Sequence, residues 1–433
     1  YRVEKNKKEE ENFLFITMCV YGVISLIILL VGLTLYFNLE TIFSNSLTLD
    51  ELSKAKVMFL ILIFNLAITL PGGAFTAICT GYEHFVFPRT VNIFRYIIRS
   101  ILVVGLMLIG GDSIGLVLLD TVMNLLVIVF NGVYVFKKLK VIFKLYEFKT
   151  PLVKEIFSYS IWVFILVIVS QLQWKAGQVI IGTLTNTTLV AIYGVGIMLG
   201  SYYGAFSSAI TGVFLPKATK MIVENVNGKE LTLMMIKIGR LVFLVLMIIF
   251  SSFILFGKQF VLLWVGDTYI DSWFVALIIM IGYTTTLIQG FANEILKAKS
   301  LFKYKAIVYI IFLGFGTLSG AFMVKTYGII GMVTGTTIGW IIAQIIMNIY
   351  FSKVIDLNIP LFFKKIFSKT IPSLFIIMII GYFIENISGV GWLNLIIKLV
   401  LHFTVYILIM YFFGMLDSEK KMVKNALSFL KRN

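Results

Sequence analysis

Three polar side chains share one face of a predicted helix inside a long apolar run. Gln171, Lys175 and Gln178 are separated by four and three residues, a spacing that aligns their heads along a helix. A cationic stripe of this kind suits phosphate oxygens, since an ammonium group compensates anions more strongly in a poorly hydrated site. Alternatively, Lys175 is close enough to the end of its run for its stem to carry the charge to the interface.

A second polar face combines Asp120 with Asn124, four residues further on. An intramembrane carboxylate with an amide beside it could bind a proton or Na⁺. It could equally be the buried partner of a cation such as Lys175 or Arg99, with a purely structural role. The residue types alone leave both interpretations open.

Two further sets of charged residues lie near the ends of apolar runs. Arg95 and Arg99 are four residues apart and could receive an entering diphosphate, although snorkelling to lipid headgroups is the simpler interpretation. Glu294 closes another run and is either a gate or an interfacial acid near Lys297.

The elements that position these residues are membrane-spanning helices. Hydrophobic residues make up 60% of the 433 residues and charged residues 13%, which excludes an ordinary soluble domain. Apolar runs of about 20 residues recur along the chain, and each is long enough to cross a hydrocarbon core. We predict twelve spans: 12–37, 55–79, 92–110, 112–136, 156–182, 187–215, 232–256, 270–295, 304–325, 327–351, 368–385 and 391–414.

The loop charges predict the orientation. Alternate loops, counted from the first residues, hold all of the 37 Lys and Arg residues except Lys54, Lys56, Lys175, Lys258, Lys325 and Lys398. Because cytoplasmic loops are enriched in Lys and Arg, both termini are expected in the cytoplasm. The net charge of +16 therefore faces anionic lipid headgroups, and we expect no nucleic-acid partner.

An internal repeat predicts two lobes. Gly111-Asp-Ser-Ile-Gly115 reappears as Tyr327-Gly-Ile-Ile-Gly331, and His84-Phe85-Val86-Phe87 corresponds to Leu301-Phe302-Lys303-Tyr304, an arrangement typical of transporters built from repeats. The second repeat has six spans and the first only four, so we expect two helices to be missing upstream. The predicted parts are an N-terminal lobe at 1–136, an amphipathic cytoplasmic linker at 137–155, a C-terminal lobe at 156–351, an extra helix pair at 352–416 and an amphipathic tail at 417–433. We expect the linker and the tail to be interfacial helices.

Several kinds of chemistry lack their residues in this chain. His84 and His402 have no Cys or carboxylate cluster at ligand spacing, so we predict no metal site and no cofactor. Phosphate-binding loops, nucleophile elbows and zinc-protease motifs do not occur, and the outer loops are too short for a polysaccharide polymerase or glycosyltransferase. The sequence therefore favours a transporter over an enzyme.

A family resemblance rests on the segment Gln178-Val-Ile-Ile-Gly182-Thr-Leu-Thr-Asn-Thr-Thr-Leu-Val-Ala-Ile-Tyr193, in which a span ends at a Gly turn and is followed by a hydrophobic-x-Tyr sequence. The segment and the six-plus-six arrangement resemble the Wzx-type polysaccharide transporters of the multidrug/oligosaccharidyl-lipid/polysaccharide exporter superfamily. The resemblance implies a MATE-like all-α bundle in the bacterial cytoplasmic membrane. It also implies transfer of an undecaprenyl-diphosphate-linked oligosaccharide to the outer leaflet for capsule, O-antigen or exopolysaccharide synthesis, through a cationic central cavity by alternating access.

The resemblance leaves two alternatives open. Family members often carry Asp where this chain has the region of Gln171 to Gln178, so coupling to H⁺ or Na⁺ is left undecided, as is contact with a polymerase or assembly proteins. A cation-coupled multidrug exporter would be expected to have a compact acidic site, whereas the spans here offer mainly Lys, Arg, Gln and Asn. A peptidoglycan-lipid flippase shares the expected architecture.

Overall fold

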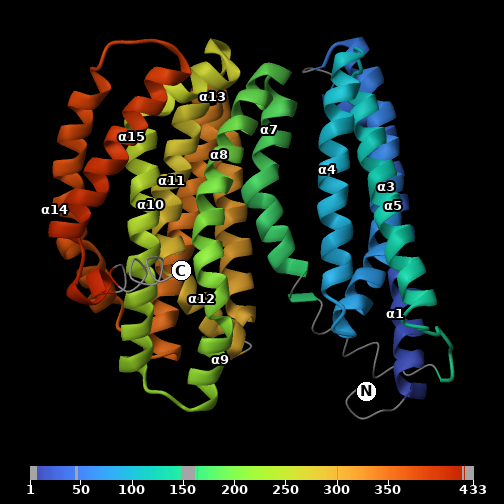
Figure 1. The fold of residues 1–433 in the computed structure, drawn as a ribbon. Coiled ribbons are helices and arrows are strands. Elements are labelled where there is room, and N and C mark those ends of the chain that lie inside the picture. Colours follow the sequence, from blue (N-terminus) through green and yellow to red (C-terminus); the bar gives the residue numbers. More distant parts are fainter. Residues whose placement is uncertain are drawn as a thin grey trace. The chain divides into compact units, whose positions relative to one another are not determined.

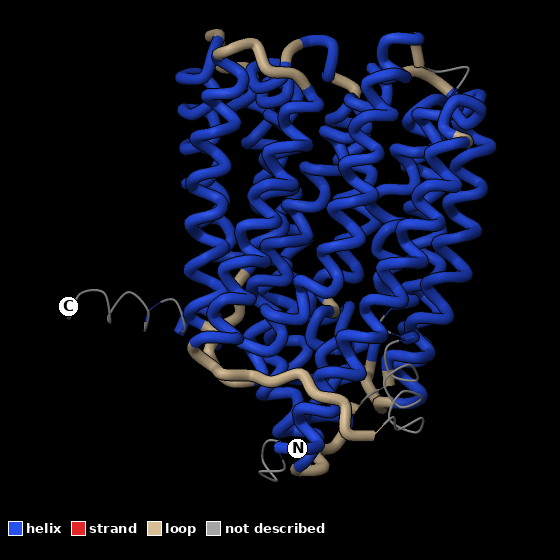
Figure 2. The backbone as a smooth tube through the Cα atoms, turned by 90° about the vertical axis from the view of Figure 1, so that its right-hand side faces the viewer, coloured by secondary structure: helices blue, strands red, loops and turns tan. Residues whose placement is uncertain are grey.

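The computed structural model describes residues 7–43, 47–147, 161–162, 164–299, 301–421 and 424. The chain divides into two compact units, unit 1 at Tyr1–Tyr159 and unit 2 at Ser160–Asn433. The described residues form helices and no strand, and the loops lie at the helix ends (Figure 2). The predicted all-α fold is therefore confirmed.

Unit 1 is built from long helices and one short one. They are α1 (Lys7–Phe37), α2 (Leu39–Phe43), α3 (Leu49–Gly81), α4 (Val86–Leu108) and α5 (Ser113–Lys137). Capping residues set where two of them begin. Thr48 and Glu51 form a reciprocal capping box at the start of α3, and Asp112 accepts the Gly115 amide at the start of α5. Helix α3 packs against both α1 and α5 (Figure 1).

Unit 2 continues with a larger bundle. Its helical elements are Phe164–Leu184, which contains η1 (Leu172–Ala176) and α7 (Gly177–Leu184), then α8 (Thr187–Thr211), η2 (Gly212–Phe214), α9 (Leu215–Val223), α10 (Gly228–Val265), η3 (Asp267–Tyr269), α11 (Ser272–Ile288), α12 (Gly290–Ala298), α13 (Phe302–Val354), α14 (Ile359–Glu385), α15 (Gly391–Ile409) and η4 (Met410–Gly414). Helix α10 is the centre of the core, because it contacts α8, α11, α14 and α15. Val242 and Leu246 of α10 are fully buried.

The described helices include eleven that are long and apolar enough to cross a membrane. One of them, α13, turns back at Gly328, whose φ of 56° and ψ of −140° are not helical. Its two arms pack face to face through Gly316, Gly335 and Gly339, where an added Cβ would collide with backbone. The arms match the predicted spans 304–325 and 327–351, so this is a multi-pass membrane protein. Large apolar side chains such as Phe375 and Leu393 are exposed, as expected of helices that face lipid.

The predicted internal repeat is visible in backbone hydrogen bonds. After α3, the amide of His84 donates to the carbonyl of Cys79 at 2.9 Å, and after α12 the amide of Leu301 donates to Leu296 at 2.9 Å. These residues occupy equivalent positions in the aligned sequence repeats. The two turns therefore have the same local geometry.

A second pair of turns, after α5 and after α13, is equivalent in the same way. Lys140 and Asp356 adopt left-handed conformations with φ of 53° and 58°. The amide of the next residue then donates back to its helix: Val141 to the Val135 carbonyl at 3.3 Å, and Leu357 to the Phe351 carbonyl at 3.2 Å. Non-glycine residues rarely adopt positive φ. The recurrence of a left-handed residue at these matching positions therefore confirms the repeat.

One expectation about the linker is wrong. The predicted interfacial helix at 137–155 is absent from its described part, because α5 ends at Lys137 and residues 141–147 are not helical. Asn12 of α1 fixes this segment instead: its Oδ1 accepts the Tyr146 amide at 2.9 Å, and its Nδ2 donates to the Glu147 carbonyl at 2.8 Å. These bonds tie the backbone at Tyr146 and Glu147 to α1. Residues 148–155 and most of the predicted tail lie outside the described residues.

Candidate functional site

In unit 1, α4 and α5 bring two of the predicted site residues together. Arg99 donates from Nη2 to Asp120 Oδ2 at 3.0 Å, and its Nε donates to the other carboxylate oxygen. Both side chains are 39% exposed, so the pair is half-buried rather than fully buried. The sequence offered Lys175 and Arg99 as possible partners of Asp120, and the structure shows that the partner is Arg99. The two charges compensate each other.

Arg95 lies one helical turn before Arg99 and has a different environment. Its side chain is half-buried, and its Nε atom has no hydrogen-bond partner in the part of the chain that the structure describes. No described carboxylate forms an ion pair with it. Within the described residues Arg95 therefore has no ion pair of its own, although its charge also acts on the nearby Asp120 carboxylate, and its guanidinium suits an anionic ligand.

Asn124 is used in helix packing. Its Nδ2 donates to Asn65 Oδ1 at 2.6 Å and to Thr69 Oγ1 at 2.7 Å, both on α3. Asp120 and Asn124 thus point to different neighbours, α4 and α3. The structure does not bring them together as one ion site, although their spacing predicted a shared face.

In unit 2, the span Phe164–Leu184 is distorted where its polar residues lie. Residues 172–176 form a single turn of π-helix, a feature often found at functional sites. Gly177 follows, and a Cβ at this position would lie 2.3 Å from the Tyr193 hydroxyl of α8, so only glycine permits this close approach. The distortion therefore sits where the span packs tightly against α8.

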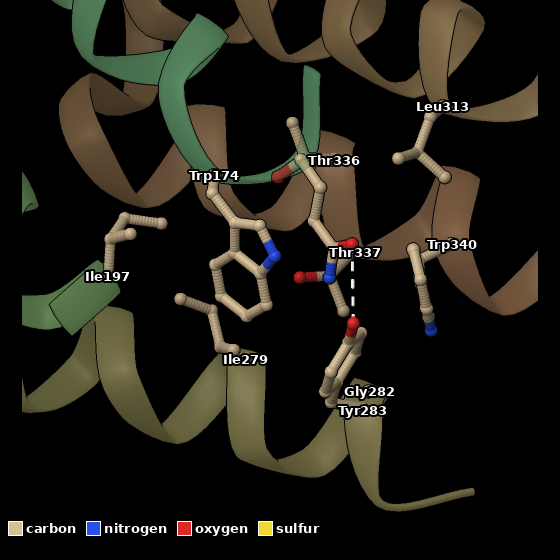
Figure 3. A pocket seen from close by; sticks show the side chains of 10 residues that line it. Trp174, Ile197, Ile279, Gly282, Tyr283, Leu313, Thr336, Thr337 and Trp340 are labelled. Atoms are coloured by element: carbon tan, nitrogen blue, oxygen red, sulfur yellow. Dashed lines mark hydrogen bonds between the residues drawn. The ribbon is translucent and has the colours of Figure 1, made fainter. Parts of the chain in front are cut away.

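The π-turn sends neighbouring side chains in different directions. Gln171 and Lys175 are exposed, whereas Gln173 and Trp174 line a pocket of unit 2, where Figure 3 shows Trp174. Gln178 is half-buried, with its Nε2 about 3.4 Å from where a Cβ would stand on Gly194 of α8. The predicted stripe is thus divided: two of its members are exposed and the third faces a neighbouring helix.

Lys175 has no ion pair or hydrogen bond to any described residue. In an apolar span this is costly unless the ammonium group reaches water, a headgroup or an anionic ligand. The exposed Gln171 lies four residues before it and can donate further hydrogen bonds to the same ligand. Among the cations of the predicted site, Lys175 and Arg95 are therefore the two that have no ion pair within the described residues.

A small cavity of about 30 Å³ lies behind the π-turn. Trp174, Tyr283 and Trp340 line it, and the Tyr283 hydroxyl donates to Gln173 Oε1 at 3.3 Å (Figure 3). The volume suffices for water but not for a sugar ring. We therefore assign the cavity to the packing of unit 2 and not to ligand binding.

Glu294 of α12 is an ion-pair residue. Its side chain is buried, and Lys297 Nζ lies 2.8 Å from its Oε1. The structure thus shows the predicted proximity to Lys297, while a gating role for the carboxylate is left as a prediction.

Two polar clusters were not predicted from the sequence. Arg240, only 1% exposed, contacts Glu419 with Nε at 2.5 Å and Nη2 at 3.0 Å. Gln344 and Gln289 form a buried amide pair within unit 2. Both glutamines interrupt apolar spans, which is the sequence signal that could have identified them.

Comparison with known proteins gives one family and one fold. A family model described as "Polysaccharide biosynthesis protein" matches residues 2–222, about half of the chain. The search of curated proteins finds no match. Among solved structures, the chain is similar to "Lipid II flippase MurJ, inward closed conformation", with a TM-score of 0.64 and 18% identity over 95% of this chain and 85% of that chain. At this identity the likeness shows a shared fold.

Proposed function

Because the chain belongs to the polysaccharide biosynthesis protein family, we propose that it is a flippase for lipid-linked oligosaccharides. The cargo would be an undecaprenyl-diphosphate-linked oligosaccharide, moved from the cytoplasmic to the outer leaflet of a bacterial cytoplasmic membrane. The product would serve surface polysaccharide synthesis. The fold shared with a structure titled "Lipid II flippase MurJ, inward closed conformation" supports a lipid cargo.

The observation that carries the proposal is the unpaired charge of Lys175. Among the cations predicted for the site, Arg99 is compensated by Asp120, whereas Lys175 is exposed and has no partner in the described residues. A diphosphate bears charges that such an ammonium group can compensate, and Gln171 adds hydrogen-bond donors to the same exposed face. A cationic drug would be repelled by these residues. The charge therefore favours the flippase over a multidrug exporter.

The proposal extends to the transport cycle. We infer alternating access along a cationic path, with both termini in the cytoplasm and Arg95 as an early contact for the diphosphate. Downstream polymerisation or a gradient of H⁺ or Na⁺ would supply the driving force, and a polymerase or other assembly proteins would take the product.

The direct test uses purified protein in proteoliposomes. The cargo is a fluorescent undecaprenyl-diphosphate-linked oligosaccharide, and its transfer is read by quenching from one side of the vesicle. We expect Lys175→Ala to slow transfer at least tenfold, and Lys175→Arg to retain most of it. Lys325→Ala is the matched control, because Lys325 is another exposed lysine in an apolar helix of unit 2. Equal rates for Lys175→Ala and wild type would contradict the proposed role of Lys175.

A peptidoglycan-lipid flippase is the second candidate, and the fold similarity to MurJ is the observation that favours it. The same vesicles would be loaded with fluorescent lipid II. Transfer of lipid II but of no lipid-linked oligosaccharide would reject our first proposal in favour of this one. Complementation of bacteria that lack either flippase provides an independent comparison.

A further inference from the structure

Two neighbouring helices of unit 2 are interrupted at the same level. Helix α8 ends at Thr211 and passes through η2 into α9. Helix α11 ends at Ile288, and α12 begins at Gly290, because Gln289 between them has φ of −95° and ψ of 15°. The interruptions touch each other: a Cβ on Gly290 would lie 2.5 Å from Thr211 Cγ2.

Beyond the interruptions, α9 and α12 pack against each other at one end of unit 2 (Figure 1). This is the lysine-rich end, which the sequence predicts to be cytoplasmic. Each segment has nine residues and is joined to the rest of its helix by a non-α-helical link. Two short helices that share a contact and bend at adjacent points can move together as one body.

A single side chain bridges the interruption in α11–α12. Gln344, on the second arm of α13, donates from Nε2 to Gln289 Oε1. Its Oε1 accepts from Thr286 Oγ1 of α11 at 3.0 Å and from the Tyr309 hydroxyl at 2.6 Å. Gln344, Gln289 and Thr286 are all buried. Gln344 thus holds the joint from the α11 side.

The joint is not fully satisfied in this arrangement. The side chain of Gln289 has no exposed surface, yet its Nε2 has no acceptor in the described part of the chain. A buried donor without a partner destabilises the arrangement that contains it. This reduces the cost of leaving the observed geometry and points to a second arrangement in which the amide is paired.

The internal repeat shows that the amide pair is particular to unit 2. The equivalent positions in unit 1 are Gly72 and Ile128, and a Cβ on Gly72 would lie 2.5 Å from the Ile128 side chain. There α3 runs through without interruption despite Pro71. An apolar contact and a continuous helix in one repeat are therefore replaced by an amide pair and a joint in the other.

We propose that Gln344 latches a hinge at Gln289, about which α9 and α12 swing together as a gate at the lysine-rich end of unit 2. The movement requires exchange of the Gln289–Gln344 hydrogen bond, while α11 and the main part of α8 stay in place. The inference concerns the moving part of the protein, and it holds whichever polar lipid is carried.

The test measures distances in the full chain by double electron–electron resonance. In a background with Cys19→Ala and Cys79→Ala, one label pair sits at Lys299→Cys, directly after α12, and at Lys364→Cys on α14, both exposed positions. A reference pair sits at Ile281→Cys on α11 and Phe375→Cys on α14. We expect Gln344→Leu to broaden or shift the first distribution by several ångströms and to leave the reference unchanged.

Two further variants separate the latch from general loosening. Gln289→Leu combined with Gln344→Leu removes both polar partners, which preserves the fold better than a single loss, and should move the first distribution in the same way. Thr286→Val disturbs the same polar core but keeps the Gln289–Gln344 hydrogen bond. This variant should leave the first distance distribution unchanged. Unchanged distances in both leucine variants, or equal broadening of the reference pair, would overturn the hinge. Because the readout is a distance, failure of the flippase assay leaves this result intact.

Discussion

Arg99 holds both carboxylate oxygens of Asp120 across α4 and α5. This pairing argues against ion coupling by Asp120, because a carboxylate whose two oxygens accept from a guanidinium has little capacity left for a coupling ion. It also explains why the neighbouring Arg95, which lacks such a partner in the described residues, is the better anion-binding candidate.

The first prediction concerns this pair. Arg99→Met and Asp120→Leu should each lower the stability of the protein by about 1 kcal/mol, a small value because both side chains are 39% exposed. The double variant Arg99→Met/Asp120→Leu should recover most of the loss, since no unpaired charge remains. Unfolding in detergent micelles measures the three values, and strictly additive losses would argue against the pair.

The same double variant distinguishes a structural role from ion coupling. If Asp120 carried H⁺ or Na⁺, the variant would be inactive however stable it was. We expect transport within about threefold of wild type, which is the scale of a modest structural perturbation.

The second prediction concerns Arg95. Arg95→Ala should reduce flipping about tenfold, because a cation that has no ion pair within the described residues contributes more to binding a diphosphate than one that is already paired. Arg95→Lys should retain part of the rate, since the charge survives although the forked geometry does not. The control is Arg89→Ala, an exposed arginine near the start of the same helix. An equal loss of the flipping rate in Arg89→Ala would show that any cation at this end of α4 contributes, and not Arg95 in particular.

The third prediction concerns the turn in α13. Gly328→Ala should destabilise the protein by about 1–3 kcal/mol, because φ of 56° with ψ of −140° is essentially restricted to glycine. Gly314→Ala is the control in the same helix, where an added Cβ meets nothing within 4 Å. It should be neutral or slightly stabilising. Thermal unfolding followed by tryptophan fluorescence provides the comparison.

The fourth prediction concerns orientation, which rests on loop charges. A cysteine replacing Lys421 should react with an impermeant thiol reagent only after the cells are opened, whereas one replacing Leu49 should react in intact cells. Both positions are exposed in the structure. The reverse pattern would invert the topology and with it the assignment of the entrance.

The repeat shows how far the sequence predicted the fold. Phe87 and Tyr134, matched in the sequence to Tyr304 and Tyr350, stack with ring centroids 3.9 Å apart, and the second pair stacks at 4.1 Å. Apolar length, turn residues and repeated motifs are local features, so they predicted the spans and the equivalent positions of the repeat. The non-helical conformation of segment 141–147 was missed because it depends on Asn12, more than 130 residues away.

The candidate site was less predictable for the same reason. Periodicity placed Lys175 and Asp120 on polar faces, but the choice of Arg99 as partner depends on how α4 meets α5. The π-turn also changed which of the predicted stripe residues share a face. No local sequence pattern predicts such a π-helical turn. Charges in apolar spans identify candidates, and three-dimensional packing decides which of them remain free.

The last prediction concerns Arg240, whose guanidinium joins α10 to the C-terminal segment. It donates to Glu419, to the Lys365 carbonyl at 2.7 Å and to the Gly414 carbonyl at 2.9 Å while only 1% exposed. Glu419→Gln should lower the free energy of unfolding by about 3–5 kcal/mol, because a buried cation loses its counter-charge. Asp417→Asn, two residues earlier and exposed, should have little effect.

Unfolding in detergent, with the free energy read for each variant, measures both changes. Glu419→Ala should lose at least as much stability as Glu419→Gln, because either change leaves the same guanidinium without its carboxylate. If Glu419→Ala were as stable as the wild type, Arg240 would be compensated from elsewhere, and Glu419 would not fix the segment after η4 to α10.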